Sequence, residues 1–166
     1  PAVKDNPVPL TGDTYGTGVL IADAEPRGAE RIVLGLGGTS TVDGGTGILV
    51  ALGVNPLDQA GYQLKPGGGA LEQLAHFDTA KVNVPAGAVE WVLLTDTTAP
   101  ATGPQGAAHV FGPQKGAGPE EVAELDQLLA SLSFLLEADL PESHAAVPGA
   151  GAAGGLGWAL MLLGAQ

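Results

Sequence analysis

Three charged side chains stand where they could act on a phosphate group. Asp43 lies near the end of the glycine-rich segment 37–45, Asp96 closes an apolar run, and Lys115 lies in the stiff segment Gly-Pro-Gln-Lys-Gly at 112–116. Phosphoryl transfer requires a cation near the phosphates and carboxylates that hold Mg²⁺ or accept a proton. The residue types suit this chemistry. Each also has a plain structural interpretation: a helix N-cap for Asp43, a turn residue for Asp96 and a solvated charge for Lys115.

Glycine-rich loops supply the second requirement of phosphate chemistry, which is backbone N–H groups that can approach a ligand closely. Three such loops each precede a helical pattern, where anions are favoured. The candidate ligand-binding residues in them are Gly37, Gly38, Thr39, Ser40, Gly112, Gln114, Gly149, Gly151 and Gly154. A tight strand-to-helix turn, or close packing of a helix on a sheet, would explain the same glycines without a ligand.

Known phosphate-binding motifs are mostly absent from the sequence. Gly35-Leu-Gly37 opens like the dinucleotide fingerprint G-x-G-x-x-G, but Ser40 occupies the third glycine position. The expected acidic residue at a strand end about 20 residues later is also missing. The phosphate-cradling motif G-x-x-x-x-G-K-[ST] does not occur. A dinucleotide-binding half-domain is therefore a weak alternative.

Charge and composition exclude several partner classes. The 166 residues include 18 acidic and 6 basic side chains, a formal net charge of −12. The basic residues are scattered singly, whereas a nucleic-acid surface needs them clustered. The same charge disfavours an anionic membrane surface, and no apolar run reaches the roughly 18 residues of a membrane span. We expect no nucleic-acid or membrane partner. The chain has no cysteine, which is compatible with the cytoplasmic location that we expect.

The elements that must position these groups follow from hydrophobic patterning. Short apolar runs at 31–36 and 89–95 predict buried strands of an α/β sheet. Helices are predicted at 17–24, 46–52, 70–74, from 119 to 136 and at 152–163, a strand or hairpin arm at 57–64, and a long loop at 97–118. The sequence therefore predicts one α/β domain over residues 1–166, with strand–glycine-rich loop–helix units. Residue chemistry alone goes no further than a domain that binds a small anionic ligand.

Four segments, by their residues and their order along the chain, resemble those of a known family. They are Asp13-Thr-Tyr-Gly-Thr-Gly18, Gly35-Leu-Gly-Gly-Thr-Ser-Thr-Val-Asp-Gly-Gly45, Phe111-Gly-Pro-Gln-Lys-Gly-Ala117 and Pro148-Gly-Ala-Gly-Ala-Ala-Gly-Gly155. This series resembles the bacterial type I glycerate kinases over essentially the whole chain. The sequence departs from the family at Val42, where an Asn is usual, and after Asp96, where Asn-Pro-Leu is usual. The additional α/β segment at the family's N-terminus and its C-terminal Gly-Glu-Gly-rich motif are also missing.

The resemblance implies an ATP- and Mg²⁺-dependent kinase that phosphorylates D-glycerate to 2- or 3-phosphoglycerate. It implies two α/β domains with the active site between them, of which this chain would be the inserted central domain and one wall of the cleft. We expect Lys115 to screen phosphate charge, and Asp43 or Asp96 to hold Mg²⁺ or accept the hydroxyl proton. A non-catalytic module that binds a small anion is the main alternative. The sequence leaves the oligomeric state open, a homo-oligomer included.

Overall fold

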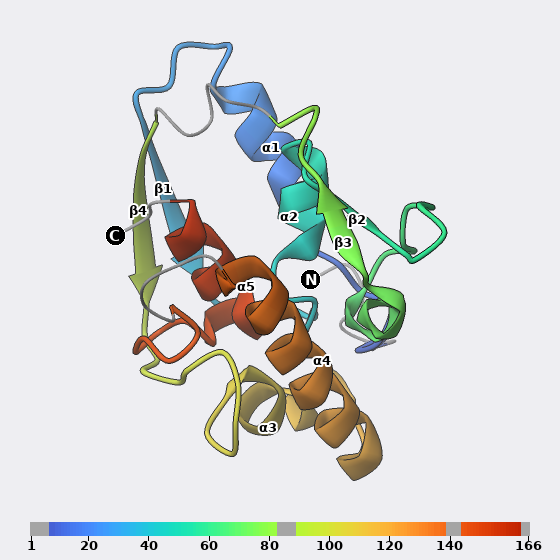
Figure 1. The fold of residues 1–166 in the computed structure, drawn as a ribbon. Coiled ribbons are helices and arrows are strands. Elements are labelled where there is room, and N and C mark those ends of the chain that lie inside the picture. Colours follow the sequence, from blue (N-terminus) through green and yellow to red (C-terminus); the bar gives the residue numbers. More distant parts are fainter. Residues whose placement is uncertain (1–6, 83–88, 139–143, 164–166) are drawn as a thin grey trace.

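The computed structural model describes residues 7–82, 89–138 and 144–163, and it shows a mixed α/β structure. In chain order its elements are α1 (Tyr15–Ala24), β1 (Arg31–Leu36), α2 (Thr46–Ala51), β2 (Asn55–Leu57), η1 (Gly68–Gln73), β3 (His76–Asp78), β4 (Glu90–Thr95), α3 (Ala107–Phe111), η3 (Pro113–Lys115), α4 (Pro119–Glu137) and α5 (Ala152–Leu162). Figure 1 shows β1 and β4 on one side, the long helix α4 on the other, and α5 between them. No helix in the described ranges is long and apolar enough to cross a membrane.

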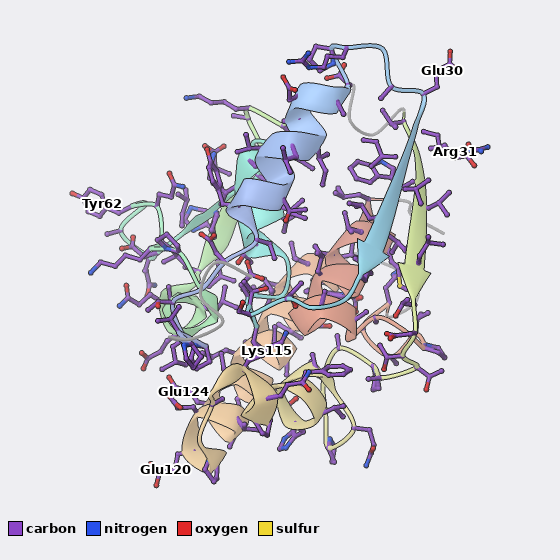
Figure 2. All side chains as sticks on the ribbon, turned by 180° about the vertical axis from the view of Figure 1, so that it is seen from behind. Glu30, Arg31, Tyr62, Lys115, Glu120 and Glu124 are labelled. Atoms are coloured by element: carbon purple, nitrogen blue, oxygen red, sulfur yellow. The ribbon has the colours of Figure 1, made fainter. Side chains whose placement is uncertain are left out.

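Strands β1 and β4 form a two-stranded parallel sheet where the apolar runs predict strands, but most of their residues are exposed or half-buried, so the expected burial is wrong. The register runs from Arg31 opposite Glu90 to Leu36 opposite Thr95. At the starting end, Arg31 Nε donates to Glu90 Oε2 at 2.7 Å. Because β1 and β4 are parallel, both strands end at the same edge of the sheet, away from Arg31 and Glu90. This carboxyl edge is where ligands bind in open α/β sheets. Figure 2 shows Arg31 at the end of β1 that is remote from Lys115.

The crossover between the two strands contains a second small sheet. Strands β2 and β3 pair antiparallel, with Asn55 opposite Asp78. The strand predicted at 57–64 is only partly confirmed, because β2 ends at Leu57. The next residues form a turn in which Asp58 Oδ1 accepts hydrogen bonds from the backbone N–H groups of Ala60 and Tyr62, each at 2.9 Å. Asx turns of this kind compete with strand pairing.

The long loop predicted over 97–118 is wrong in part, because it contains the helices α3 and η3. Helix α3 buries Ala107 and Ala108 completely. Its five residues are too few to show an apolar periodicity, and alanine contributes little to one. A side chain at Gly112 would collide with the carbonyl of Ala108, so the chain turns tightly from α3 into η3. This turn places Lys115 inside the protein.

Two hydrophobic clusters meet at helix α5. The first lies under α4 and contains Val122, Leu125, Leu129 and Leu132, which confirms the predicted helical spacing, together with Trp158 of α5. The second joins α1, α2, β1 and β4, and it receives Leu156 and Leu160 from α5. Helix α5 therefore buries opposite faces in different clusters, and it fixes the sheet relative to α4.

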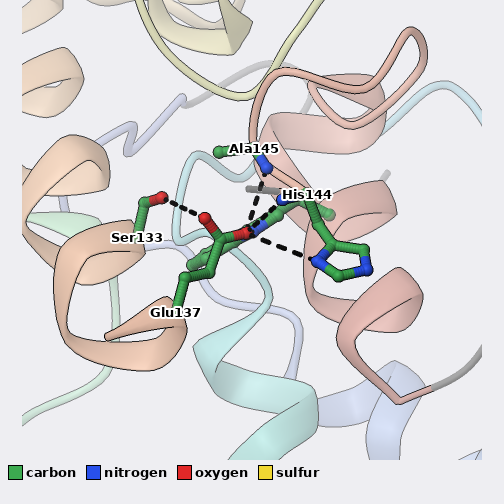
Figure 3. Close-up of polar contacts among 5 residues, drawn as sticks. Ser133, Glu137, His144 and Ala145 are labelled. Atoms are coloured by element: carbon green, nitrogen blue, oxygen red, sulfur yellow. Dashed lines mark hydrogen bonds and ion pairs between the residues drawn. The ribbon is translucent and has the colours of Figure 1, made fainter. Parts of the chain in front are cut away.

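The carboxylate of Glu137, at the end of α4, joins several segments around the first cluster. Its side chain is only 7% exposed. Oε1 accepts hydrogen bonds from the backbone N–H groups of His144 and Ala145, at 2.7 and 3.1 Å, and from Trp158 Nε1 at 2.7 Å (Figure 3). Ser133 Oγ donates to Oε2 at 3.2 Å. One side chain thus joins α4, the 144–145 turn and α5.

We expect Glu137→Ala to lower the free energy of unfolding by about 3 kcal/mol, because buried donors lose their acceptor. Urea denaturation measures this. Glu124→Ala on the exposed face of α4 is the matched control, and it should change the value by less than about 0.5 kcal/mol. Equal effects of the two variants would show that Glu137 is not an anchor.

Candidate functional site

A cavity of about 180 Å³ lies at the edge of the sheet where β1 and β4 end. Six of the predicted site residues line it, namely Gly37, Gly38, Thr39, Asp96, Gln114 and Lys115. Asp96 is exposed and directly follows β4. Gly37 and Gly38 directly follow β1, and η3 contributes Gln114 and Lys115. Segments almost 80 residues apart in the sequence therefore meet at one small recess, which we call the Lys115 pocket.

Lys115 is a buried cation, only 5% exposed. Its Nζ donates to the carbonyl oxygen of Thr41 at 2.6 Å and to Thr39 Oγ1 at 3.1 Å. Within the described residues, these bonds leave one of its three ammonium N–H groups without a partner. Burial lowers the pKa of Lys115 to about 8, and the negative charge of Asp43 opposes that shift. The pocket therefore contains a cation whose charge changes close to neutral pH.

Asp43 lies behind this pocket and does not line it. It is completely buried. Its Oδ2 accepts hydrogen bonds from Thr14 N and Thr14 Oγ1, both at 2.9 Å, and from Gly47 N at 3.1 Å. Oδ1 accepts one from Gly45 N at 3.2 Å. Burial raises the pKa of Asp43, while these donors oppose the rise by stabilising the carboxylate. A ligand at Asp43 would have to displace these contacts.

The other predicted residues lie around the pocket without lining it. Ser40 is half-buried and Gly112 is buried in the turn after α3. The three predicted glycines of the loop at 149–155 are buried where the backbone passes other segments closely. A side chain at Gly151 would collide with the carbonyl of Pro100, and one at Gly154 with the carbonyl of Thr41. In this structure these glycines permit close packing, which is the structural interpretation that the sequence left open.

Sequence reasoning missed several residues of the site. Ala153 lines the pocket, and its φ of 54° is left-handed, an uncommon state for a residue with a side chain. Gly154 and Gly155 continue the left-handed run, and the Gly154 carbonyl accepts a hydrogen bond from Gly44 N at 3.0 Å. The kink thereby fixes the loop that carries Asp43. No signal in one sequence predicts a left-handed alanine.

Thr14 and Thr41 complete the surroundings of the two charges. Thr14 Oγ1 donates to Asp43 and accepts from Ile48 N at 3.1 Å, so that it joins α1 to α2. The hydroxyl of Thr41 is buried and has no hydrogen-bond partner among the described residues. A buried hydroxyl without a partner is uncommon enough to suggest a missing partner. The capping pattern Asp13-Thr14 ahead of α1 could have indicated Thr14 from the sequence.

The donor set at the pocket fits Mg²⁺ held mainly by a phosphate ligand. Mg²⁺ commonly binds through one or two carboxylates, with water and substrate phosphates completing its octahedron. Asp96 offers one exposed carboxylate at the pocket, and Thr39 offers a hydroxyl. In the described part of the chain, no group of three or more His, Cys, Asp or Glu residues could hold a metal by itself. Asp96 therefore fits the ion better than Asp43, whose oxygens are occupied.

Comparison with known proteins identifies the relatives of this chain. The model of the glycerate kinase family matches residues 1–166. The glycerate kinase of Bacillus subtilis is 45% identical over 161 residues, which cover 97% of this chain and 42% of that protein. The glycerate 2-kinase of Escherichia coli K12 is 40% identical over 167 residues, with 100% and 43% covered. The chain thus spans less than half the length of these relatives.

A solved structure agrees with the sequence relatives. The crystal structure of a glycerate kinase 2 from Salmonella typhimurium LT2 matches with a TM-score of 0.93 and 41% sequence identity. The match covers 98% of this chain and 44% of that one. The shared fold therefore includes nearly every element described above.

Proposed function

The chain belongs to the glycerate kinase family, and from that premise we propose that it supplies part of an active site that transfers phosphate from ATP to D-glycerate. The observation that carries the proposal is the buried Lys115 ammonium in a recess at the carboxyl edge of the sheet. A desolvated cation interacts with a phosphate far more strongly than one in water. The family match supports kinase chemistry, and the pocket supports the location.

The proposed step divides the work among three side chains. A glycerate hydroxyl oxygen forms a bond to the γ-phosphorus, the bond from that phosphorus to the ADP oxygen breaks, and the hydroxyl proton passes to a carboxylate. Lys115 neutralises charge on the phosphate oxygens, and Asp96 accepts the proton or holds Mg²⁺. Mg²⁺, when bound, neutralises charge on the ATP phosphates. Asp43, which does not line the pocket, favours the charged form of Lys115 through its negative charge.

We also propose that the rest of a complete kinase covers the open face of the sheet. Val33 on β1 and Leu94 on β4 are 54% and 58% exposed. Parallel sheets are normally covered on both faces, whereas this two-stranded sheet leaves apolar residues uncovered. The relatives are more than twice as long as this chain, which supports such a cover and an interdomain cleft beside the Lys115 pocket. The same proposal places the enzyme in the cytoplasm, where ATP is available, and leaves its oligomeric state open.

Phosphorus NMR tests the proposed reaction. A complete kinase that contains this chain should convert ATP and D-glycerate into ADP and a phosphomonoester, whose position on the glycerate also decides between the 2- and 3-phosphate. The chain alone should release ADP at no more than about 1% of that rate, because one wall of the cleft is absent. A coupled ADP-release assay with and without D-glycerate measures this. Robust turnover by the chain alone would contradict the divided site.

A further inference from the structure

A second and larger cavity lies on the other side of the Asp43 loop. Its volume is about 390 Å³, and it lies between the first turns of α1 and α2 and the segment 63–67. The chain that follows β1 thus borders both cavities: Gly37–Thr39 of the loop line the Lys115 pocket, and Thr46 and Gly47, the first residues of α2, line this one. We call it the Tyr15 pocket.

The walls of the Tyr15 pocket suit a flat, weakly polar ring. Val50, Pro56 and Leu64 supply apolar surface, and Tyr15 adds an aromatic side chain that is 47% exposed. Pockets for small molecules are typically apolar with a few polar groups that fix orientation, and their volumes start near 300 Å³. The Lys115 pocket has less than half the volume of the Tyr15 pocket and contains the buried charge, so the two recesses differ in the ligand chemistry they favour.

Polar groups at the rim match the edge of a purine. Asp13 offers carboxylate oxygens, which accept from an amino group, and Gln63 offers an amide that can both donate and accept. Lys65 also lines the pocket and offsets the charge of Asp13, so the rim has no net charge that would favour a phosphate, whereas the Lys115 pocket contains a buried cation. We propose that the Tyr15 pocket binds the adenine ring of the nucleotide. The inference rests on the proposed ATP-dependent function.

One exposed glycine at the edge of the pocket can take a side chain without disturbing the fold. Gly16 lies in the first turn of α1 and lines the pocket, and a side chain added there would meet no atom within 4 Å. Leucine also favours a helix more than glycine does. Gly47 offers no such choice, because its added side chain would collide with the backbone of Thr14 and Tyr15.

The test compares adenosine, which has no phosphate, with ATP in a complete kinase that contains this chain. Isothermal titration of Gly16→Leu should show adenosine binding weakened about tenfold or more, the order of effect expected when a pocket loses space for part of its ligand. Gly16→Ala, which adds only a methyl group, is the matched control and should bind within about threefold of the parent protein. Lys115→Met should leave adenosine binding unchanged and weaken ATP binding.

The outcomes separate this inference from the proposed function. If Gly16→Leu kept the adenosine affinity of the parent protein, or remained active with an unchanged KM for ATP, the adenine assignment would be overturned. The proposed kinase function would not be affected by either result. A third outcome is that the complete protein transfers no phosphate to D-glycerate but still binds adenosine, and that Gly16→Leu abolishes this binding. That outcome would support the adenine assignment and overturn the kinase proposal. NMR shifts confined to residues 13–16, 46–50 and 63–67 on adding adenosine would support the assignment directly.

Discussion

Lys115→Met in a complete kinase should lower kcat/KM for ATP by about 100- to 1000-fold, which is the range for removing one preorganised charge-stabilising group. The structure supplies the reason, because the ammonium is 5% exposed and already held by Thr39 and Thr41. No reorganisation is then needed when phosphate charge develops. Steady-state kinetics with D-glycerate in excess measure the loss.

The pH dependence gives a sharper version of the same prediction. With a pKa of about 8, Lys115 loses its charge as the pH rises through 8, so kcat/KM for ATP should fall on the alkaline side. Lys115→Arg keeps its charge throughout this range and should lose that alkaline limb, even if its rate is lower. If Lys115 had only a structural role, Lys115→Arg would leave the alkaline limb of kcat/KM where it is in the parent protein.

An exposed lysine provides the control for charge alone. Lys81 lies on the surface outside both pockets, so Lys81→Met should leave kcat/KM within about twofold of the parent protein. Parental kinetics in Lys115→Met would remove this residue from the site. Equal losses in both lysine variants would indicate a general effect of net charge instead.

The sequence predicted some parts of the site and not others. The elements that it predicted correctly are those with a strong local pattern of apolar residues. Continuous apolar runs predicted β1 and β4, and because parallel strands end at one edge of a sheet, Gly37 and Asp96 lie near each other in the structure. Helix α4 was recognisable from its apolar stripe and Pro119. The conformation of these elements follows from the pattern of neighbouring residues, so it could be predicted without knowledge of tertiary contacts.

The positions of the buried charges depend on long-range packing, which one sequence does not reveal. Nothing in the sequence marks Asp43 and Lys115 as buried. Asp43 is buried against Thr14 and the start of α2, and Lys115 is buried in η3 against Thr39 and Thr41. The hydrogen bonds from Thr14 to Asp43 join residues 29 positions apart. The Tyr15 pocket likewise combines four separate segments, of which only 13–16 belongs to a motif quoted from the sequence.

Asp43→Asn should shift the alkaline limb of kcat/KM for ATP to lower pH. The carboxylate raises the pKa of Lys115 against the effect of burial, so its neutralisation lets the ammonium lose its proton earlier. The same variant should lower the free energy of unfolding by about 3 kcal/mol, because the new amide NH2 replaces one carboxylate oxygen and then faces either Gly45 N or the donors of Thr14 and Gly47. A pH–rate profile and urea denaturation measure the two effects.

Thr14→Val separates the electrostatic effect of Asp43 from its structural effect. Loss of the Thr14 hydroxyl removes one donor to Asp43 and the acceptor of Ile48 N, and should cost about 1–2 kcal/mol of stability. The charge of Asp43 remains in this variant, so the alkaline limb should stay near pH 8. If Asp43→Asn kept the parental limb, Lys115 would not respond to Asp43. If Thr14→Val moved the limb as far as Asp43→Asn, loop geometry rather than charge would set the pKa of Lys115.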